Sequence, residues 1–128
     1  GTGNDLVRAN QGRVAPGAGR DVIRFTKGGV VMYSHAKQPV FVDLRRGIAW
    51  GQGQDVLHGV VDAIGSKFGD TLWGNRQPNH LVGFWGNDAL YGRGGDDFLV
   101  GFRGKDLAVG NQGRDDCLAE LRVGCKKL

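Results

Sequence analysis

Apolar and polar positions recur with a fixed period of nine over residues 65–118. Read in nines, this segment is GSKFGDTLW, GNRQPNHLV, GFWGNDALY, GRGGDDFLV, GFRGKDLAV and GNQGRDDCL. Every unit opens with glycine, has Asp or Asn in the sixth place, and has Leu, Ala or Cys in the eighth place. Six units in one phase indicate a short structural element stacked on itself.

The eighth place predicts a short strand with a single inward side chain. Side chains alternate along a strand, so an inward eighth residue leaves the seventh and ninth facing outward. Two successive units make one coil, and units two apart then stack on the same side. The predicted inward columns are Leu72, Leu90 and Ala108, and Leu81, Leu99 and Cys117. The glycine-rich first half of each unit predicts a tight turn, because glycine readily adopts positive φ.

Residues 1–64 contain similar units with glycines and an aspartate, but at less regular spacing. The fragments GTGNDLVR and PGAGRDVIR carry Asp5 and Asp21 in the sixth-place position, but closer together than two full units, which predicts a slipped register. The runs GVVMYS and PVFVDL are β-branched and bounded by Gly or Pro, as strands are. GQGQDVLHG returns to the repeat style with Asp55. Only the tail CLAELRVGCKKL has a helical signal, which predicts a short helical turn capping the stack.

We therefore expect a single all-β domain over residues 1–128. It divides into irregular lead-in coils at residues 1–64, six regular repeats at residues 65–118 and a tail at residues 119–128. No run approaches the roughly 18 apolar residues that a membrane-spanning helix needs.

The sixth-place side chains indicate a metal. They form two predicted columns, Asp70, Asp88 and Asp106 on one side and Asn79, Asp97 and Asp115 on the other. Carboxylates about 5 Å apart repel one another unless a cation lies between them. Carboxylate and carbonyl oxygens are hard ligands that suit Ca2+, which takes about six to eight of them. The alternative, in which Asp and Gly are only turn residues, does not account for one phase kept over six units.

The units resemble the G-G-x-G-x-D-x-U-x repeat of the RTX (repeats-in-toxin, haemolysin-type) calcium-binding proteins. The upstream run VFVDLRRGIAWGQGQDVLHGVVDAIGSKF is similar to the less regular segment that precedes such repeats in secreted bacterial proteins, so the resemblance covers about residues 17–117. It implies a right-handed parallel β-roll, a β-helix solenoid of short strands. It also implies Ca2+ between successive turns on the same side, with about three to four ions per chain.

The resemblance further implies which atoms bind each ion. One turn contributes the carbonyls of its second and fourth places and its Asp, and the next same-side turn contributes those of its first and third places and its Asp. The first implied site pairs Asp70 with Asp88 and uses the carbonyls of Ser66, Phe68, Gly83 and Trp85. The second pairs Asp88 with Asp106 and uses Phe84, Gly86, Gly101 and Arg103. The third pairs Asp97 with Asp115 and uses Arg93, Gly95, Gly110 and Gln112. The fourth pairs Asn79 with Asp97 and uses Asn75, Gln77, Gly92 and Gly94.

Some positions depart from the family pattern. The amide of Asn79 carries no charge, so its site should be the weakest. Phe68 and Gln77 replace the fourth-place Gly, so these two turns should differ in geometry. Val61 stands where a carboxylate is usual, and we expect no site there.

The irregular aspartates of the lead-in have a separate expectation. The register argues against calcium at Asp5 and Asp21. Asp55 precedes Asp70 by less than two full units, which leaves an irregular shared site open.

The resemblance implies a secreted, extracellular protein. In that setting Cys117 and Cys125 would form a disulfide around a loop of about nine residues, worth roughly 2–3 kcal/mol, that pins the tail over the last coil. The alternative is two free thiols. The chain starts inside a repeat-like fragment, so it is either a mature secreted product or a piece of a longer protein.

The formal net charge is +4 and the pI about 9.4, although the family is usually acidic. The basic residues of the repeats and tail are Arg93, Arg103, Lys105, Arg114, Arg122, Lys126 and Lys127. They favour an acidic partner such as a polysaccharide or a cell-surface polymer, or they serve solubility alone. No nucleic-acid-binding motif accompanies them.

The outward places are unusually apolar, with Trp73, Tyr91 and Phe98 among them. They form either a contact surface or a face covered by the N-terminal segment or the tail. Phe84, Trp85 and Phe102 fall in turns of one column, where they either stack on sugar rings or shield the calcium row.

No catalytic set is visible. The only serines, Ser34 and Ser66, lie outside any G-x-S-x-G motif, and His35, His58 and His80 are scattered. The sequence thus predicts a secreted, non-enzymatic calcium-binding β-roll whose folding is driven by Ca2+. The alternative is a binding or adhesion module that recognises acidic polysaccharide through its basic and aromatic face.

Overall fold

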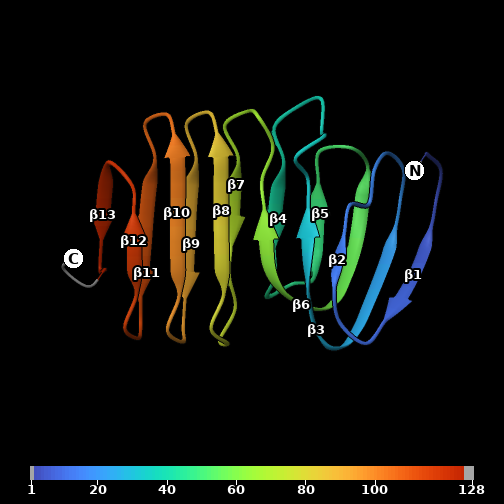
Figure 1. The fold of residues 1–128 in the computed structure, drawn as a ribbon, viewed down its shortest axis with the longest axis horizontal. Coiled ribbons are helices and arrows are strands. Elements are labelled where there is room, and N and C mark those ends of the chain that lie inside the picture. The colour runs from blue at the N-terminus through green and yellow to red at the C-terminus, as the bar shows by residue number, and fades with distance from the viewer. Residues whose placement is uncertain (1, 126–128) are drawn as a thin grey trace.

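The computed structural model describes residues 2–125 (Figure 1). This part of the chain forms thirteen strands and no helix. The lead-in strands are β1 (Leu6–Ala9), β2 (Arg13–Val14), β3 (Val22–Met32), β4 (Phe41–Asp43), β5 (Ile48–Trp50) and β6 (Gln54–Ile64). The repeat strands are β7 (Thr71–Trp73), β8 (His80–Trp85), β9 (Ala89–Arg93), β10 (Phe98–Arg103), β11 (Leu107–Asn111) and β12 (Asp116–Leu118). The tail contains β13 (Leu121–Val123).

The repeats form two parallel walls. Strands β7, β9 and β11 pair in one wall, and β8, β10 and β12 pair in the other. The residues in register are those predicted, Leu72, Leu90 and Ala108 in one column and Leu81, Leu99 and Cys117 in the other. All six side chains have an exposed fraction of 0%. The prediction of an all-β fold built as a parallel β-roll is confirmed.

The lead-in continues the same two walls (Figure 1). Strand β4 pairs in parallel with β7, and β6 pairs in parallel with β8 and β3. Strands β1 and β2 both pair in parallel with β3. The core is wider here than in the repeats, because it holds Ile23, Val31, Tyr33 and Val42, each at most 1% exposed.

The lead-in differs from prediction in its register. Leu6 lies beside Val22 and Ala9 beside Phe25, without a shift, although the step from Asp5 to Asp21 is shorter than two full units. The prediction of a slipped register there is wrong. The loop between the two strands is simply shorter, because pairing fixes the strands and not the length of their connection.

Strand β5 departs from the parallel plan. It pairs antiparallel with both β4 and β6. The chain reverses just after β4, where the Gly47 N–H donates to the Asp43 carbonyl at 2.9 Å. A connection this short joins only antiparallel neighbours, since parallel neighbours need a crossover of about a dozen residues.

The tail forms a strand, so the predicted helical turn is wrong. Strand β13 pairs in parallel with β11, with Leu121 beside Leu107. The open edge of β11 offers unpaired backbone groups, whereas an isolated helical turn of this length is unstable in water. The predicted disulfide between Cys117 and Cys125 is confirmed. Lys126 and Lys127, and with them the end of the tail, lie outside the described residues.

The described parts of both terminal segments extend the walls, and several outward side chains remain exposed. On one face Trp73 and Tyr91 stack with ring centroids 4.2 Å apart. On the other, Phe98 is 38% and Leu118 47% exposed. Val100, at another outward place, is only 8% exposed. Among the described residues there is no helix of the length and apolarity needed to cross a membrane.

Candidate metal sites in the repeat turns

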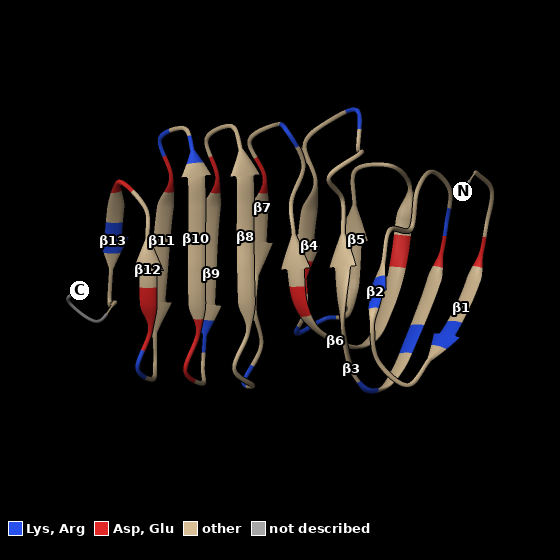
Figure 2. Cartoon of the chain, in the orientation of Figure 1, with Lys and Arg blue, Asp and Glu red and all other residues tan. Residues whose placement is uncertain are grey.

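The sixth-place side chains stand in two buried rows at the ends of the strands. We name them the Asp88 row (Asp70, Asp88 and Asp106) and the Asp97 row (Asn79, Asp97 and Asp115). Their members are at most 3% exposed. Figure 2 shows acidic positions recurring where successive strands begin, with basic residues in the neighbouring turns.

Each row is a ladder of backbone-to-carboxylate hydrogen bonds. In the Asp88 row, the Asp70 N–H donates to Asp88 Oδ1 at 2.8 Å and the Asp88 N–H donates to Asp106 Oδ1 at 2.9 Å. In the Asp97 row, the Asn79 N–H donates to Asp97 Oδ1 at 2.8 Å and the Asp97 N–H donates to Asp115 Oδ1 at 2.9 Å. The structure therefore brings together all four pairs of sixth-place residues that the sequence assigned to calcium.

The second oxygen of four carboxylates lacks a partner. The Oδ2 atoms of Asp88, Asp97, Asp106 and Asp115 are buried and accept no hydrogen bond. A buried polar atom without a partner costs about 1–3 kcal/mol, and a charged one costs more. These four atoms need a cation or a proton, and the donor set of hard oxygens fits Ca2+.

The opening glycines are required by this packing. A Cβ on Gly83 would collide with the Asp88 carboxylate, and the same holds for Gly101 and Asp106. A Cβ on Gly65 would meet both Asp70 Oδ2 and the Gly83 carbonyl. Carboxylate and first-place carbonyl oxygens from two turns thus gather at one point. The opening glycines are not at positive φ, so close approach explains them better than the turn conformation does.

Positive φ occurs at the fourth and second places of units three to six. The fourth places are Gly86, Gly95, Gly104 and Gly113. The second places are the non-glycine residues Phe84, Arg93, Phe102 and Asn111, with φ of 89°, 75°, 74° and 70°. These values lie in the left-handed region, which costs a residue with a Cβ roughly 1–2 kcal/mol.

The remaining carbonyls implied as ligands lie in the same stacked turns. A Cβ on Gly104 would collide with the Gly86 carbonyl, so fourth-place oxygens face the next turn. The second-place carbonyl of Arg93 accepts from the Gln112 N–H at 2.9 Å, and that of Asn75 accepts from the Gly94 N–H at 3.1 Å. Each of these oxygens keeps a second lone pair for a cation.

In the first unit, the Asp70 carboxylate is hydrogen-bonded within its own turn. Asp70 Oδ2 accepts from the Ser66 N–H, and Asp70 Oδ1 accepts from the Ser66 hydroxyl at 2.7 Å and the Val40 N–H at 2.8 Å. Phe68 lacks the positive φ found at the fourth place of later units, as expected of a turn that differs. Asp55 has other partners: its Oδ1 accepts from the Asp21 N–H, and its Oδ2 accepts from the Tyr33 hydroxyl.

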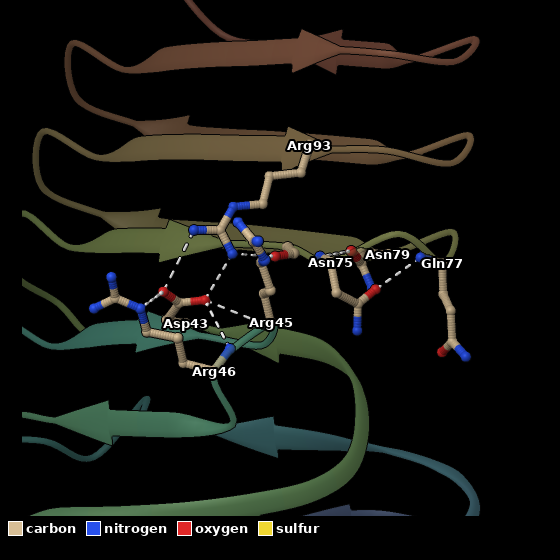
Figure 3. A network of polar contacts seen from close by, with 8 residues as sticks. Asp43, Arg45, Arg46, Asn75, Gln77, Asn79 and Arg93 are labelled. Carbon is tan, nitrogen blue, oxygen red and sulfur yellow. Dashed lines mark hydrogen bonds and ion pairs between the residues drawn. The ribbon is translucent and has the colours of Figure 1, made fainter.

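The second unit carries an amide, Asn79, at the sixth place (Figure 3). Asn79 Oδ1 accepts from the Asn75 N–H at 2.8 Å, and Asn79 Nδ2 donates to the Val61 carbonyl at 2.6 Å. The amide thus gives the Val61 carbonyl a hydrogen-bond partner within the protein. Gln77 also lacks positive φ.

Arg93 ties the lead-in to the repeats in the same region (Figure 3). Its guanidinium donates to Asp43 Oδ1 at 2.8 Å and to the Gly74 carbonyl at 3.1 Å, and it lies 4.7 Å from the centroid of Trp73. Asp43 also accepts from the backbone N–H groups of Arg45 and Arg46. This buried carboxylate is fully used and is not a candidate ligand.

The electrostatics of the rows favour a bound positive charge. Burial raises the pKa of Asp88 to about 7, and the neighbouring Asp70 and Asp106 raise it further against the lowering effect of the Asp70 N–H. Burial also raises the pKa of Asp97 to about 7, with Asp115 adding to it. The pKa values of Asp70, Asp106 and Asp115 are likewise raised, mainly by burial. Without a cation, Asp88 and Asp97 therefore keep a proton to a higher pH than an ordinary aspartate does.

Glu120 was missed by the sequence reasoning. The Asp106 N–H donates to Glu120 Oε2 at 2.9 Å, so Glu120 continues the Asp88 row in the tail. The segment ELRVG at 120–124 copies DLAVG at 106–110, which is the signal that could have revealed it. Its spacing of 14 residues in place of 18 hid the relation.

Side chains alone do not form a metal site in these rows. Among the described residues, no group of three or more His, Cys, Asp or Glu side chains could hold a metal, so an ion here needs backbone carbonyls as well.

The comparisons with known proteins agree with this geometry. No curated protein matches the chain. Residues 64–99 and 82–117 match the family of the RTX calcium-binding nonapeptide repeat. Residues 64–117 are therefore RTX calcium-binding nonapeptide repeats, folded as a parallel β-roll.

Proposed function

We propose that the chain is a secreted, non-enzymatic calcium-binding module whose β-roll completes its folding when Ca2+ binds. The observation that carries the proposal is the set of four buried Oδ2 atoms without a hydrogen-bond partner. All four lie within residues 64–117, the segment that matches the RTX calcium-binding nonapeptide repeat.

The chain's own residues define a ranking of sites. The pairs of Asp88 with Asp106 and of Asp97 with Asp115 offer unpartnered oxygens from both turns. Asp70 enters its pair with Asp88 with its oxygens already hydrogen-bonded to Ser66. Asn79 brings no charge to its pair with Asp97. A bound Ca2+ supplies the positive charge that the stacked carboxylates lack, and three to four ions per chain follow.

The coupling to folding follows from the narrow core. Each wall of the repeats buries one side chain per coil, and the last ones are only Ala108 and Cys117. Ordering a chain costs about 1–2 kcal/mol per residue in backbone entropy. Ion binding adds directly to folding stability when the site exists only in the folded state. The roll should therefore be loose at cytosolic calcium and complete at the millimolar calcium found outside cells.

The disulfide supports an extracellular setting. Bonds such as Cys117–Cys125 form and persist in oxidising compartments and are rare in the cytosol.

The test is a calcium titration of the full chain after removal of bound ions with EDTA. Far-ultraviolet circular dichroism should show a gain of β-structure at roughly 0.1–1 mM Ca2+. Calorimetry should count the ions, and Mg2+ should not reproduce the transition. Asp88→Asn and Asp97→Asn should each lose two ions, because each carboxylate serves two pairs. The control Asp96→Asn changes an exposed neighbour outside the rows and should keep the parent count. A parent that is equally folded in EDTA and binds no Ca2+ would refute the proposal.

A second candidate function is binding of acidic polysaccharide. Trp85 is 41% exposed, and the side chains of Lys67 and Arg103 each lie 5.6 Å from its ring. Phe84 stacks on Trp85 at 5.5 Å, and Phe102 is 66% exposed nearby in the same set of turns. Rings for stacking on sugars and charges for uronates are thus combined in one surface.

Affinity electrophoresis against a polyuronate and against neutral dextran would test this candidate. We expect retardation by the polyuronate alone, weakened by salt and by Trp85→Ala. Trp50→Ala is the matched control, since Trp50 is 40% exposed in β5, outside this surface. Equal migration in both gels would exclude the candidate.

A further inference from the structure

We infer that the lead-in carries a further metal site, in which Asp21 and Asp55 bind one divalent cation, Ca2+ by preference. The inference rests on the proposed function of the repeats but concerns residues outside the matched segment 64–117. Asp5 and Asp21 lie just before β1 and β3, and Asp55 lies at the start of β6. We name these three residues the Asp21 row. Figure 2 shows acidic positions where these three strands begin.

The Asp21 row repeats the hydrogen-bond ladder of the two rows already described. The Asp5 N–H donates to Asp21 Oδ1 at 2.8 Å, and the Asp21 N–H donates to Asp55 Oδ1 at 3.0 Å. The Val56 N–H returns a bond to the Asp21 carbonyl at 2.8 Å, as the Ala89 N–H does to the Asp70 carbonyl at 2.9 Å. Sequence steps of 16 and 34 residues thus produce the contacts that steps of 18 produce in the repeats.

The turns before these aspartates also match the repeat turns. Gly19 and Gly53 stand two places before Asp21 and Asp55, at φ of 122° and 138°. A Cβ on Gly53 would collide with the Gly19 carbonyl, just as one on Gly104 would collide with the Gly86 carbonyl. One place before the aspartate, the Arg20 N–H donates to Asn4 Oδ1 at 2.8 Å, and the Lys105 N–H donates to Asn87 Oδ1 at 2.9 Å.

An unpartnered oxygen marks the ligand position. Asp21 is 1% exposed, and its Oδ2 accepts no hydrogen bond. The Oδ2 atoms of Asp88, Asp97, Asp106 and Asp115 share this property. No Lys, Arg or His of the described chain forms an ion pair with Asp21 or Asp55. Two buried aspartates, joined by a backbone-to-carboxylate hydrogen bond, therefore lack a compensating charge from the described part of the protein.

Two features limit the row to one ion: Asp5 is exposed, unlike the buried Asp21 and Asp55, and Tyr33 occupies the far side of Asp55. The Tyr33 hydroxyl donates to Asp55 Oδ2 at 2.8 Å, and the ring is 1% exposed. The hydroxyl fills the position on Asp55 that would serve a further ion beyond this turn. Tyr33 and the turn residues Gly17, Ala18, Gly51 and Gln52 also line a cavity of about 560 Å³ beside these turns.

The experiment counts ions in the full chain at saturating Ca2+ by equilibrium dialysis and elemental analysis. Asp21→Asn should lower the count by one relative to the parent while the far-ultraviolet spectrum in Ca2+ stays the same. Asp62→Asn is the matched control, because Asp62 lies in β6 outside the row, where it accepts the His80 N–H, and it should keep the parent count. An unchanged count for Asp21→Asn, in a parent that does bind Ca2+, would overturn this inference and leave the proposed function standing. A parent without bound Ca2+ would overturn both.

A second measurement uses the parent chain and does not depend on a variant that folds. Mn2+ accepts the same oxygen ligands and broadens nuclear magnetic resonance signals close to it. Added in small amounts to the calcium-loaded protein, it should broaden the amide signals of Asp21 and Asp55 and the ring signals of Tyr33. Broadening at Asp88 and Asp97 without broadening at Asp21 and Asp55 would overturn the lead-in site alone.

Discussion

The backbone N–H of Asp106 donates to Glu120 at 2.9 Å, in the manner in which the N–H of Asp88 donates to Asp106. A glutamate 14 residues away thus takes the place that an aspartate takes 18 residues away. The longer side chain makes up for the shorter loop. The Asp88 row therefore ends on a carboxylate, and the tail is part of the ladder.

Replacing Glu120 should loosen the end of the roll. In Glu120→Ala the Asp106 N–H loses its acceptor, so β13 should pair less firmly with β11. We expect faster hydrogen exchange at the Asp106 and Leu121 amides and a lower melting temperature in Ca2+. Arg122→Ala, two residues on and exposed, is the control. Equal exchange in both variants would show that Glu120 contributes nothing to the ladder.

The calcium-free roll should lose stability as the pH rises. The pKa of Asp88 and of Asp97 is raised to about 7, against about 3.9 for an unfolded aspartate. The folded state then binds more protons than the unfolded state between these values, so stability is greatest below about pH 4 and falls as the pH approaches 7. Melting in EDTA at pH 5 and pH 7.5 tests this, and a higher melting temperature at pH 7.5 would contradict it. With saturating Ca2+ the fall should disappear, because the ion replaces the protons.

Relieving a strained turn should stabilise the protein. Phe102 is at φ 74° and is 66% exposed, so Phe102→Gly removes the strain of its Cβ and little buried surface. We expect a gain of up to about 1 kcal/mol in the free energy of unfolding, after the loss to the greater freedom of glycine in the unfolded chain. Phe98→Gly, in the same strand and without positive φ, should destabilise instead. Denaturant unfolding of both variants in Ca2+ measures these free energies. Equal losses of unfolding free energy in the two variants would refute the assignment of strain to Phe102.

Arg93 should couple the lead-in to the repeats. Asp43 is buried, and Arg93→Ala would remove its 2.8 Å ion pair while two backbone donors and the exposed, more distant Arg46 guanidinium at 3.8 Å remain. We expect a loss of roughly 2–3 kcal/mol in unfolding free energy, near the lower end for a broken buried ion pair. Arg114→Ala, in an exposed turn, should change stability by less than about 0.5 kcal/mol. If Arg93→Ala behaved like this control, the two halves would be joined by backbone pairing alone.

The period of nine was sufficient to predict the walls, the core columns and the pairing of the rows. A constant period fixes the register, so Leu72, Leu90 and Ala108 could be aligned without any structure. The period fails as a guide where the loop length varies. There the equivalent hydrogen bonds join residues that are 14, 16, 30 or 34 positions apart in the sequence. Glu120, the Val40 contact to Asp70 and the Asp21 row all lie at such steps.

The antiparallel β5 and the strand in the tail were missed for a related reason. Each of these strands forms because an adjacent strand edge has unpaired backbone N–H and C=O groups. The local sequence pattern does not show where such an edge lies. The strain at Phe84 and Phe102 was also invisible, since the sequence shows only that the second glycine of the usual repeat is absent. The left-handed backbone is imposed by the stacked turns above and below.

The disulfide and the two short strands β12 and β13 also affect whether copies of the molecule associate end to end. Solenoids grow into fibres when one open end docks on another. Here the terminal strands β12 and β13 have three residues each, and Cys117–Cys125 links β12 to the chain just after β13. Such short, tethered edges offer a poor template for a further chain.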